Sequence, residues 1–365
     1  LCEHFIISTS VNVSSLISLS LANCGLRGQF PTNIFLMPKL SKIDLSYNHL
    51  LIGFLLEFHS GSSLELLDLS STNFFGILPN SIDNLESFIK LDLSQAKLSW
   101  EIPNSIGNLQ SLNFLDLSSN LSNNPFHGEI PFSLGNLTQL EFLFLFNSSF
   151  DGSTLKLQNI SSSQLNYLDL MINKLYGSIP RSITNFTYLQ YLYLSSINPK
   201  DMLRSCNLLE FPIFLKSLNE LQYLDLSNNK IESKVPKWFW NVGKETLQSL
   251  NLSFNHFSGS EQPLNILPWK NMRYLNLRSN MLQGLLPTPP LSIDYFLASN
   301  NNLTGRIPPM ICILNAFQVL DLSNNQLIGQ IPHCLVMGYA SGLDWLLDMS
   351  SSQGGQIIGL EELLE

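Results

Sequence analysis

The chain repeats a short pattern in which two apolar residues are separated by one other residue. Residues 221–230, LQYLDLSNNK, show it, with Leu224 and Leu226 on either side of Asp225. Because successive side chains of a β-strand point to opposite faces, each apolar pair predicts a short strand with one buried face. The first member of the pair falls at positions 19, 43, 67, 91, 115, 143, 168, 192, 224, 250, 275, 296 and 320. The sequence therefore predicts thirteen short strands at a spacing close to 24 residues.

The polar residues of the pattern have fixed places. A lone carboxylate in a core is unfavourable, so Asp225 is expected on the exposed face of its strand while Leu224 and Leu226 face inward. Asn229, five residues after Leu224, is expected to turn inward and bond the backbone of neighbouring repeats. The equivalent positions are Cys24, Asn48, Asn120, Asn173, Asn255, Asn280, Asn301 and Asn325.

A second pattern, G-x-I-P or a variant, follows many of these polar positions, as at residues 128–131 and 305–308. Glycine allows a tight bend, and proline cannot extend a hydrogen-bonded ladder. Segments such as PNSIGNLQSL, residues 103–112, then predict a return by short helical turns. The period and the pattern L-x-x-L-x-L-x-x-N-x-L match a leucine-rich repeat. The predicted fold is an α/β repeat solenoid, a right-handed superhelix with a parallel concave β-sheet and short helical or 3-10 turns on the convex side.

The repeat also sets the expected domain organisation. At 365 residues, a globular chain would form two or three domains, but a solenoid grows without enlarging its core. Residues 1–15 are expected to be a remnant of an N-terminal cap region, and residues 16–336 an array of about 13 units. Residues 337–365 are expected to be a tail outside the repeat.

Composition and charge argue against several classes of function and structure. Charged residues make up 13% of the chain, about half the usual share, and the net charge of −9 gives no basic face for nucleic acid. Five cysteines without a CxxC motif indicate neither a zinc ribbon nor a dense disulfide framework. No run of about 18 apolar residues is present, so no membrane span is expected within this chain.

Longer phrases carry a resemblance to a known family. They are VPKWFWNVGKETLQSLNLSFN at 235–255, LPWKNMRYLNLRSNMLQG at 267–284 and LDLSNNQLIGQIPHCL at 320–335. Together with L-x-G-x-I-P at the repeat spacing, they resemble plant leucine-rich repeat receptor-like proteins of the Cf resistance type. Members of that family have a leucine-rich ectodomain with a cysteine-paired cap at each end, one membrane span and no kinase. Here only Cys2 could belong to an N-terminal cap, and residues 337–365 fit neither a repeat nor a span, which predicts a partial or truncated member.

The resemblance implies a function and a location. It implies an ectodomain that binds an extracellular peptide, protein or pathogen elicitor and signals in defence through a partner receptor kinase. It also implies the secretory pathway and the extracellular side of the plasma membrane, or the apoplast if the chain ends as given. One alternative is a soluble apoplastic inhibitor of a pathogen cell-wall hydrolase, similar to polygalacturonase-inhibiting proteins. A second alternative is a truncated, nonfunctional product.

Outward positions of the concave strands are where the family binds its ligands, and from the fifth unit onward they are largely aromatic. Parallel strands lie about 4.8 Å apart, so the rings of units five to eight should form one continuous patch, and exposed patches of this kind mark interaction sites. The alternative is that aromatic residues are there because they suit strands. The candidate ligand-binding residues are Phe114, Phe142, Phe144, Phe146, Tyr167, Tyr191, Tyr193, Tyr223 and Tyr274.

Four aspartates, Asp44, Asp68, Asp92 and Asp116, should stack on consecutive strands, with Lys42 and Lys90 on the same face to relieve their repulsion. We expect a solvated row, with a cation or basic-peptide site as the alternative.

Sequons suit a secreted glycoprotein, and the candidate glycosylation sites are Asn136, Asn185, Asn159 and Asn302. The six histidines lie in different phases of the repeat, without metal spacing or a Ser/His/Asp arrangement, and the glycine loop of a kinase is missing. No catalytic residue, metal site or cofactor is therefore expected.

Overall fold

The computed structural model describes residues 15–98, 101–119, 128–152, 164–175, 181–195, 208–262, 266–314 and 318–336. The chain divides into two compact units, residues 1–206 and 207–365. Within each unit, every repeat contributes one short strand to a parallel sheet, and most repeats return through a 3-10 turn. The predicted leucine-rich solenoid is confirmed. The expected cap remnant and tail lie, apart from residue 15, outside the described residues.

The parallel sheet of the first unit is built from the predicted apolar pairs. Leu91 of one strand aligns with Leu115 of the next, so equivalent positions of successive repeats stack in columns. In order, its strands are β1 (Ser18–Ser20), β3 (Lys42–Asp44), β5 (Leu66–Asp68), β7 (Lys90–Asp92), β9 (Phe114–Asp116), β11 (Phe142–Phe144), β13 (Tyr167–Asp169) and β14 (Tyr191–Tyr193).

The second unit repeats the arrangement with its own parallel strands, in the same register. Leu250 aligns with Leu224 on one side and Leu275 on the other. The strands are β15 (Tyr223–Asp225), β16 (Ser249–Asn251), β17 (Tyr274–Asn276), β19 (Tyr295–Leu297) and β21 (Val319–Asp321).

Stacked aliphatic side chains form the core between the strands and the returning turns. Leu91, Leu93, Leu115 and Leu117 are 0% exposed. Burying each such side chain stabilises the fold by roughly 1.5–3 kcal/mol, and every repeat supplies several. The solenoid is therefore held together chiefly by contacts between neighbouring repeats.

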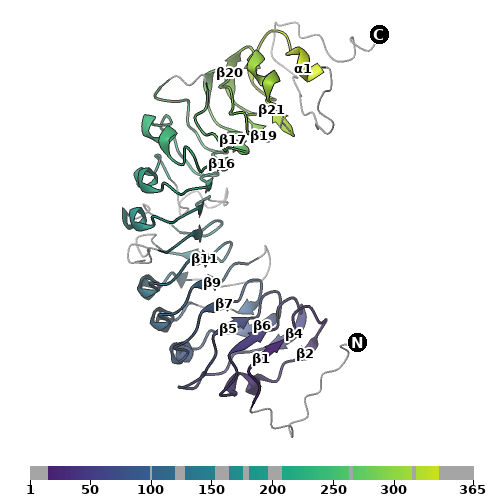
Figure 1. Ribbon diagram of the computed structural model, residues 1–365, viewed down its shortest axis with the longest axis vertical. Coiled ribbons are helices and arrows are strands. Elements are labelled where there is room, and N and C mark those ends of the chain that lie inside the picture. Colours follow the sequence, from purple (N-terminus) through teal and green to yellow (C-terminus); the bar gives the residue numbers. More distant parts are fainter. Residues whose placement is uncertain are drawn as a thin grey trace. The chain divides into compact units, whose positions relative to one another are not determined.

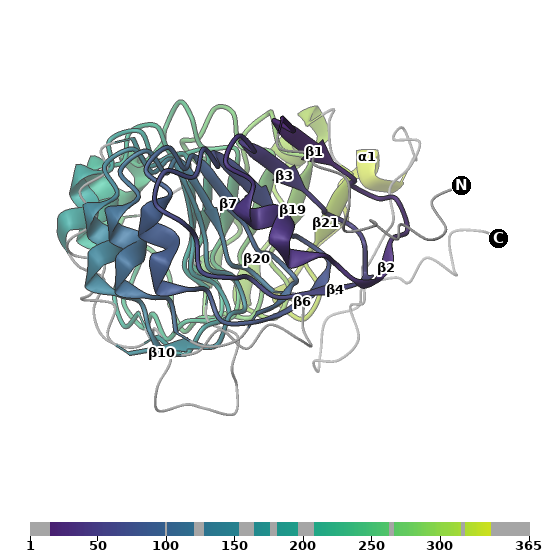
Figure 2. The same cartoon turned by 90° about the horizontal axis from the view of Figure 1, so that it is seen from below.

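Proline starts most of the returning turns. Pro79, Pro103 and Pro131 are extended residues that immediately precede η2, η3 and η4, where the fixed φ of proline suits the entry to a helical turn. The blue turns of the first unit lie stacked beside one another, on the side of the coil away from the strands (Figures 1 and 2). The turns are η1 (Thr32–Leu36), η2 (Asn80–Asn84), η3 (Asn104–Asn108), η4 (Phe132–Asn136), η6 (Arg181–Asn185), η7 (Ile213–Ser217), η8 (Lys237–Asn241) and η9 (Pro309–Ile313).

The predicted inward asparagines are confirmed wherever the structure describes them, whereas Asn120 lies outside the described residues. Asn48 is 1% exposed, and its Nδ2 donates to the carbonyl oxygens of Leu21 and Leu45, both at 2.8 Å. Its Oδ1 accepts the Leu26 N–H at 2.9 Å. One side-chain amide thus joins two repeats, because it satisfies backbone N–H and C=O groups that have no backbone partner there.

A second set of short parallel strands, which the sequence analysis does not predict, follows the asparagine positions. Glycine ends or begins several of these strands with a left-handed φ, +83° at Gly128 and +80° at Gly305, where a larger residue would be strained. The strands are β2 (Arg27–Gln29), β4 (Leu50–Gly53), β6 (Asn73–Gly76) and β8 (Lys97–Leu98), then β10 (Gly128–Glu129) with β12 (Phe150–Asp151), and β18 (Gln283–Leu285), β20 (Asn302–Gly305) and β22 (Gln326–Leu327).

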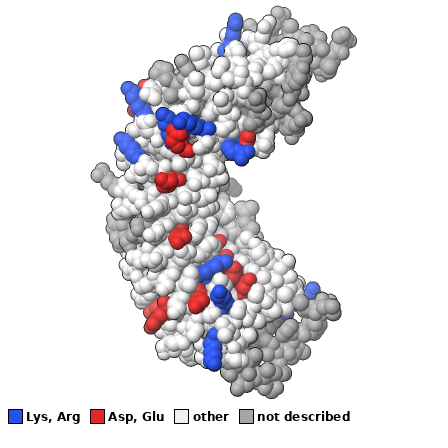
Figure 3. All heavy atoms as spheres, viewed as in Figure 1, with Lys and Arg blue, Asp and Glu red and all other residues white. Residues whose placement is uncertain are grey.

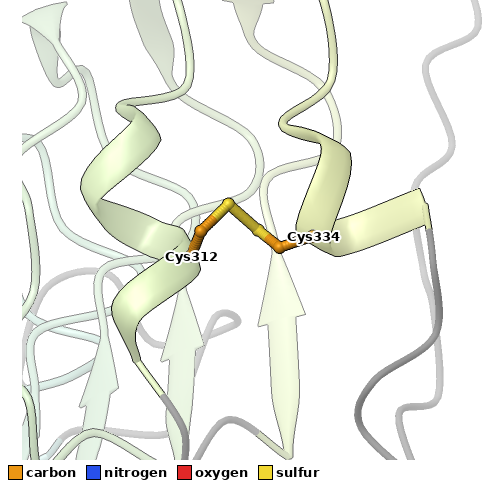
Figure 4. The surroundings of a disulfide bond; sticks show 2 residues. All are labelled: Cys312 and Cys334. Atoms are coloured by element: carbon orange, nitrogen blue, oxygen red, sulfur yellow. A yellow bond between two sulfur atoms is a disulfide. The ribbon is translucent and has the colours of Figure 1, made fainter.

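A disulfide joins Cys312 of η9 to Cys334 of α1 (His333–Val336), as Figure 4 shows. The Cα atoms are 5.5 Å apart, and the two cysteines are 22 residues apart in sequence, close to one repeat. The last described coil is therefore covalently tied to the coil before it. Among the described residues, no helix is long and apolar enough to cross a membrane.

Candidate functional site

The outward aromatic residues of the first unit lie on four consecutive strands, β9, β11, β13 and β14. All of them are half-buried, because each ring covers its neighbours while keeping one face or edge towards solvent. We call this set the aromatic surface; it comprises Phe114, Phe142, Phe144, Phe146, Tyr167, Tyr191 and Tyr193.

Ring contacts connect most of the aromatic surface into one cluster. The Phe114 centroid lies 5.9 Å from that of Phe142 and 5.4 Å from that of Phe144. Phe144 lies 4.3 Å from Tyr167, which stacks on Tyr191 at 5.1 Å and contacts Tyr193 at 5.5 Å. Phe146 lies two residues beyond the end of β11. Such contacts add about 0.5–1.5 kcal/mol per pair, so the surface is preorganised before any partner arrives.

The Tyr167 hydroxyl lies among acidic groups at the middle of this cluster. Burial raises the pKa of Tyr167, and the neighbouring Tyr193 and the Asp169 carboxylate raise the pKa further. Tyr167 therefore keeps its proton at any physiological pH and remains a hydrogen-bond donor.

The aspartate row lies beside the aromatic surface, and its prediction as a solvated row is wrong for Asp68 and Asp92, whereas Asp44 and Asp116 are half-buried. Asp68 and Asp92 are each only 8% exposed, and in the second unit Asp321 is 3% exposed. The side chains do point away from the leucine core. Each, however, turns back to accept the backbone N–H of the serine two residues later, as Asp92 does from Ser94 at 3.1 Å. The serine hydroxyl also donates to Asp92, at 2.7 Å, so a local turn shields the carboxylate.

Lys90 links the aspartate row to the aromatic surface. Its Nζ lies 2.9 Å from Asp68, 3.5 Å from Asp92 and 4.9 Å from the centroid of the Phe114 ring. Burial alone would lower the pKa of Lys90, but the hydrogen bond and attraction of Asp68, with Asp92, raise it. The expectation that Lys90 relieves the aspartate row is confirmed; its contact with Phe114 is one that the sequence analysis missed.

Asp116 occupies the place where the two features meet. It is flanked by Asp92 on β7 and by Phe144 on β11. Burial raises the pKa of Asp116 to about 6, while the Ser118 hydrogen bonds act in the opposite direction. Burial also raises the pKa of Asp92. The surface of the first unit thus combines aromatic rings with carboxylates that are poorly solvated.

The other two candidate ligand-binding residues, Tyr223 and Tyr274, belong to the second unit. Ser249 of β16 lies between them, so the aromatic column is interrupted there, and Tyr274 instead contacts Tyr295 at 6.1 Å between ring centroids. This unit also carries ion pairs. Arg273 bonds Asp294 at 2.7 Å, and the Arg278 Nε reaches Asp321 at 2.8 Å. The second unit therefore offers a more polar surface.

Charged side chains are few on the face shown in Figure 3, where most of the described surface is neither acidic nor basic. Among the described residues, no group of three or more His, Cys, Asp or Glu could hold a metal ion. The candidate glycosylation sites Asn136, Asn185 and Asn302 are exposed, the first two at the ends of η4 and η6. Asn159 lies outside the described residues.

Comparisons with known proteins agree with this geometry. A family model described as Leucine rich repeat matches residues 203–257, and a second one of the same description matches residues 63–85 and 316–336. The chain therefore has a leucine-rich repeat fold. Both models describe a structural repeat, not a catalytic domain.

Plant receptors are among the proteins that this chain resembles. The chain is 47% identical to Receptor-like protein 7 of Arabidopsis thaliana over 133 residues, which is 36% of this chain and 13% of that protein. The plant peptide hormone receptor RGFR1 in complex with RGF2 matches with a TM-score of 0.69 and 29% identity, over 88% of this chain and 54% of that one. The Arabidopsis receptor kinase HAESA, in complex with the peptide hormone IDA and the co-receptor SERK1, matches with a TM-score of 0.65 and 25% identity, over 89% of this chain and 61% of that one.

These matches confirm the resemblance to plant leucine-rich repeat receptor-like proteins. The narrower assignment to the Cf resistance type stays a prediction. The leucine-rich repeat chain spans less than two thirds of the length of each of these relatives.

Proposed function

We propose that the chain is the ligand-binding part of an extracellular plant receptor-like protein, and that the aromatic surface contacts an extracellular peptide or protein. The observation that supports this most strongly is the cluster of half-exposed rings on four consecutive strands. Monomeric proteins rarely leave such a surface open unless it meets a partner, and aromatic residues dominate binding hot spots.

The comparisons support a receptor more than an inhibitor of cell-wall hydrolases. Receptor-like protein 7 is named as a receptor, and the RGFR1 and HAESA ectodomains are bound to peptide hormones. HAESA is also bound to a co-receptor, which supports a co-receptor as a partner of this chain. Our proposal is that this co-receptor carries a kinase and relays the signal in defence. The proposed location is the extracellular side of the plasma membrane, where exposed Asn136, Asn185 and Asn302 would carry glycans.

The test uses peptides selected from a random-sequence display library on the immobilised chain. The affinity of a selected peptide is then measured for the wild type and for a variant with Phe142→Ala, Phe144→Ala and Tyr191→Ala. Each truncation of a hot-spot ring weakens binding by about 1 kcal/mol or more, so the triple variant should lose roughly 100-fold in affinity.

The control is Tyr188→Ala, a 57% exposed tyrosine beyond η6 and outside the aromatic surface. It should bind as the wild type does. Equal circular dichroism spectra and unfolding midpoints of the three proteins show that folding is unchanged. Unaltered affinity of the folded triple variant would refute the proposal, as would a selection that enriches no peptide.

A further inference from the structure

A cation is already bound where the aspartate row meets the aromatic surface. The Lys90 ammonium is bound there by the Asp68 and Asp92 carboxylates and lies 4.9 Å from the Phe114 centroid. Carboxylates supply charge, while the face of an aromatic ring attracts a cation that has lost part of its water. The chain thus satisfies one carboxylate pair with a cation of its own.

On the strands that follow β7, carboxylate and ring again lie together, but the column that holds Lys90 contains no basic residue. Phe114 of β9 and then Phe142 of β11 take the place that Lys90 holds on β7, and Tyr167 and Tyr191 follow on β13 and β14. Asp116 accepts the Ser118 backbone N–H at 2.8 Å and stands between Asp92 and the Phe144 ring. A row of carboxylates here continues into a row of rings.

We propose that the ligand places a lysine or arginine side chain against Asp116, over the solvent-facing side of the contacting Phe114 and Phe144 rings. This rests on the proposed function and specifies its ligand class: an extended peptide segment with a basic residue next to apolar or aromatic ones. Charge complementarity selects this occupant, because Asp92, Asp116 and Asp169 would all repel an acidic group. An arginine suits the place best, since its planar guanidinium both stacks on rings and bonds a carboxylate.

The ionisation of Asp116 supports the same assignment. A carboxylate whose burial raises its pKa to about 6 is poorly solvated in the unliganded protein, and an incoming cation would stabilise its charged form. The charged and titratable groups that act on it are Lys90 and Asp92 on β7, with Tyr167 on β13. Tyr167 stays neutral, and Lys90 stays charged. Binding of a basic peptide should therefore weaken as the pH falls through about 6.

The experiment compares two selections from the same random-sequence display library, on the wild-type chain and on Asp116→Asn, near neutral pH. Peptides enriched on the wild type should contain lysine or arginine beside apolar residues, and this enrichment should disappear on the variant. A synthetic copy of an enriched peptide should lose about tenfold in affinity or more when its basic residue becomes glutamine, or when Asp116 becomes asparagine. The two changes together should weaken binding little more than either one alone.

The matched control is Asp225→Asn in the second unit. Asp225 accepts the Ser227 N–H at 2.8 Å in the same kind of turn, and burial raises its pKa too. It should not affect the peptide. If enriched peptides need the aromatic surface but carry no basic residue and ignore Asp116→Asn, this inference is wrong and the proposed function survives. If no peptide is enriched on either protein, both fail.

Discussion

Replacing an inward asparagine should destabilise the fold, and the expected loss in the free energy of unfolding follows from the hydrogen bonds that the side chain makes. Asn255 is 4% exposed; its Nδ2 donates to the Leu226 carbonyl at 2.9 Å, and its Oδ1 accepts the Ile231 N–H at 3.1 Å. In Asn255→Ala, the Leu226 carbonyl keeps the bond from Asn229 at 3.0 Å, but the Ile231 N–H loses its acceptor. An orphaned buried donor costs about 1–3 kcal/mol, and the remaining lost bonds add about 1 kcal/mol. The expected loss is roughly 2–4 kcal/mol in the free energy of unfolding.

Urea unfolding followed by tryptophan fluorescence measures this loss, because Trp269 is 1% exposed in the same unit, one repeat away. Hydrogen exchange at the Ile231 amide should accelerate in parallel, since repeat proteins can open locally. The control is Asn219→Ala, an exposed asparagine of the same unit, which should change stability by less than about 0.5 kcal/mol. If Asn255→Ala were no more destabilising than Asn219→Ala, the asparagines would not join the repeats as described.

Three further predictions follow. Replacing Cys312 and Cys334 by serine, or adding reductant, should lower the free energy of unfolding of the second unit by about 3 kcal/mol in the chain-entropy account, measured by urea titration. The pKa of Asp116 is raised from 3.8 in the unfolded state to about 6 in the folded state. Between these two pH values the folded state binds more protons than the unfolded state, so this group makes the free energy of unfolding fall as the pH rises. Asp116→Asn should remove that slope and be more stable than the wild type at pH above about 6, and an unchanged pH profile would contradict the burial of this carboxylate. Glycopeptide mapping of chain secreted from plant cells should find glycans at exposed Asn136 and Asn185, and unmodified asparagine at both sites would contradict the proposed secretory route.

The repeat could be predicted from sequence because its determinants are local and periodic. Strand alternation alone places Leu224 and Leu226 inside, and stacking then requires that Asn229 finds backbone partners. The burial of Asp92 could not be predicted in the same way. It depends on the hydrogen bond from the Ser94 hydroxyl to the carboxylate and on the Lys90 ammonium reaching Asp92. Both contacts depend on side-chain rotamers, which the repeat pattern does not determine.

Other features could be predicted only from how neighbouring coils of the solenoid stack on one another. The second set of strands forms because segments such as Leu50–Gly53 and Asn73–Gly76 come within hydrogen-bonding distance only after the main sheet is stacked. The pairing of Cys312 with Cys334 could have been predicted from the sequence, because their separation of 22 residues is close to one repeat and places them on neighbouring coils. The aromatic residues were correctly placed on neighbouring strands, but the contact of Lys90 with Phe114 depends on how far a flexible side chain reaches.

The central claim, that the aromatic surface is where a partner binds, is tested most directly by photocrosslinking from two single positions that are close in the sequence. Phe142 lies on β11 in the aromatic surface, whereas Phe132 is 44% exposed on η4, the turn that leads into β11. A photoreactive phenylalanine analogue is placed at either position, and the chain is irradiated with a peptide selected from the display library. We predict a crosslink from position 142 that excess unlabelled peptide suppresses, and none from position 132. Crosslinking from position 132 with none from position 142 would contradict the account.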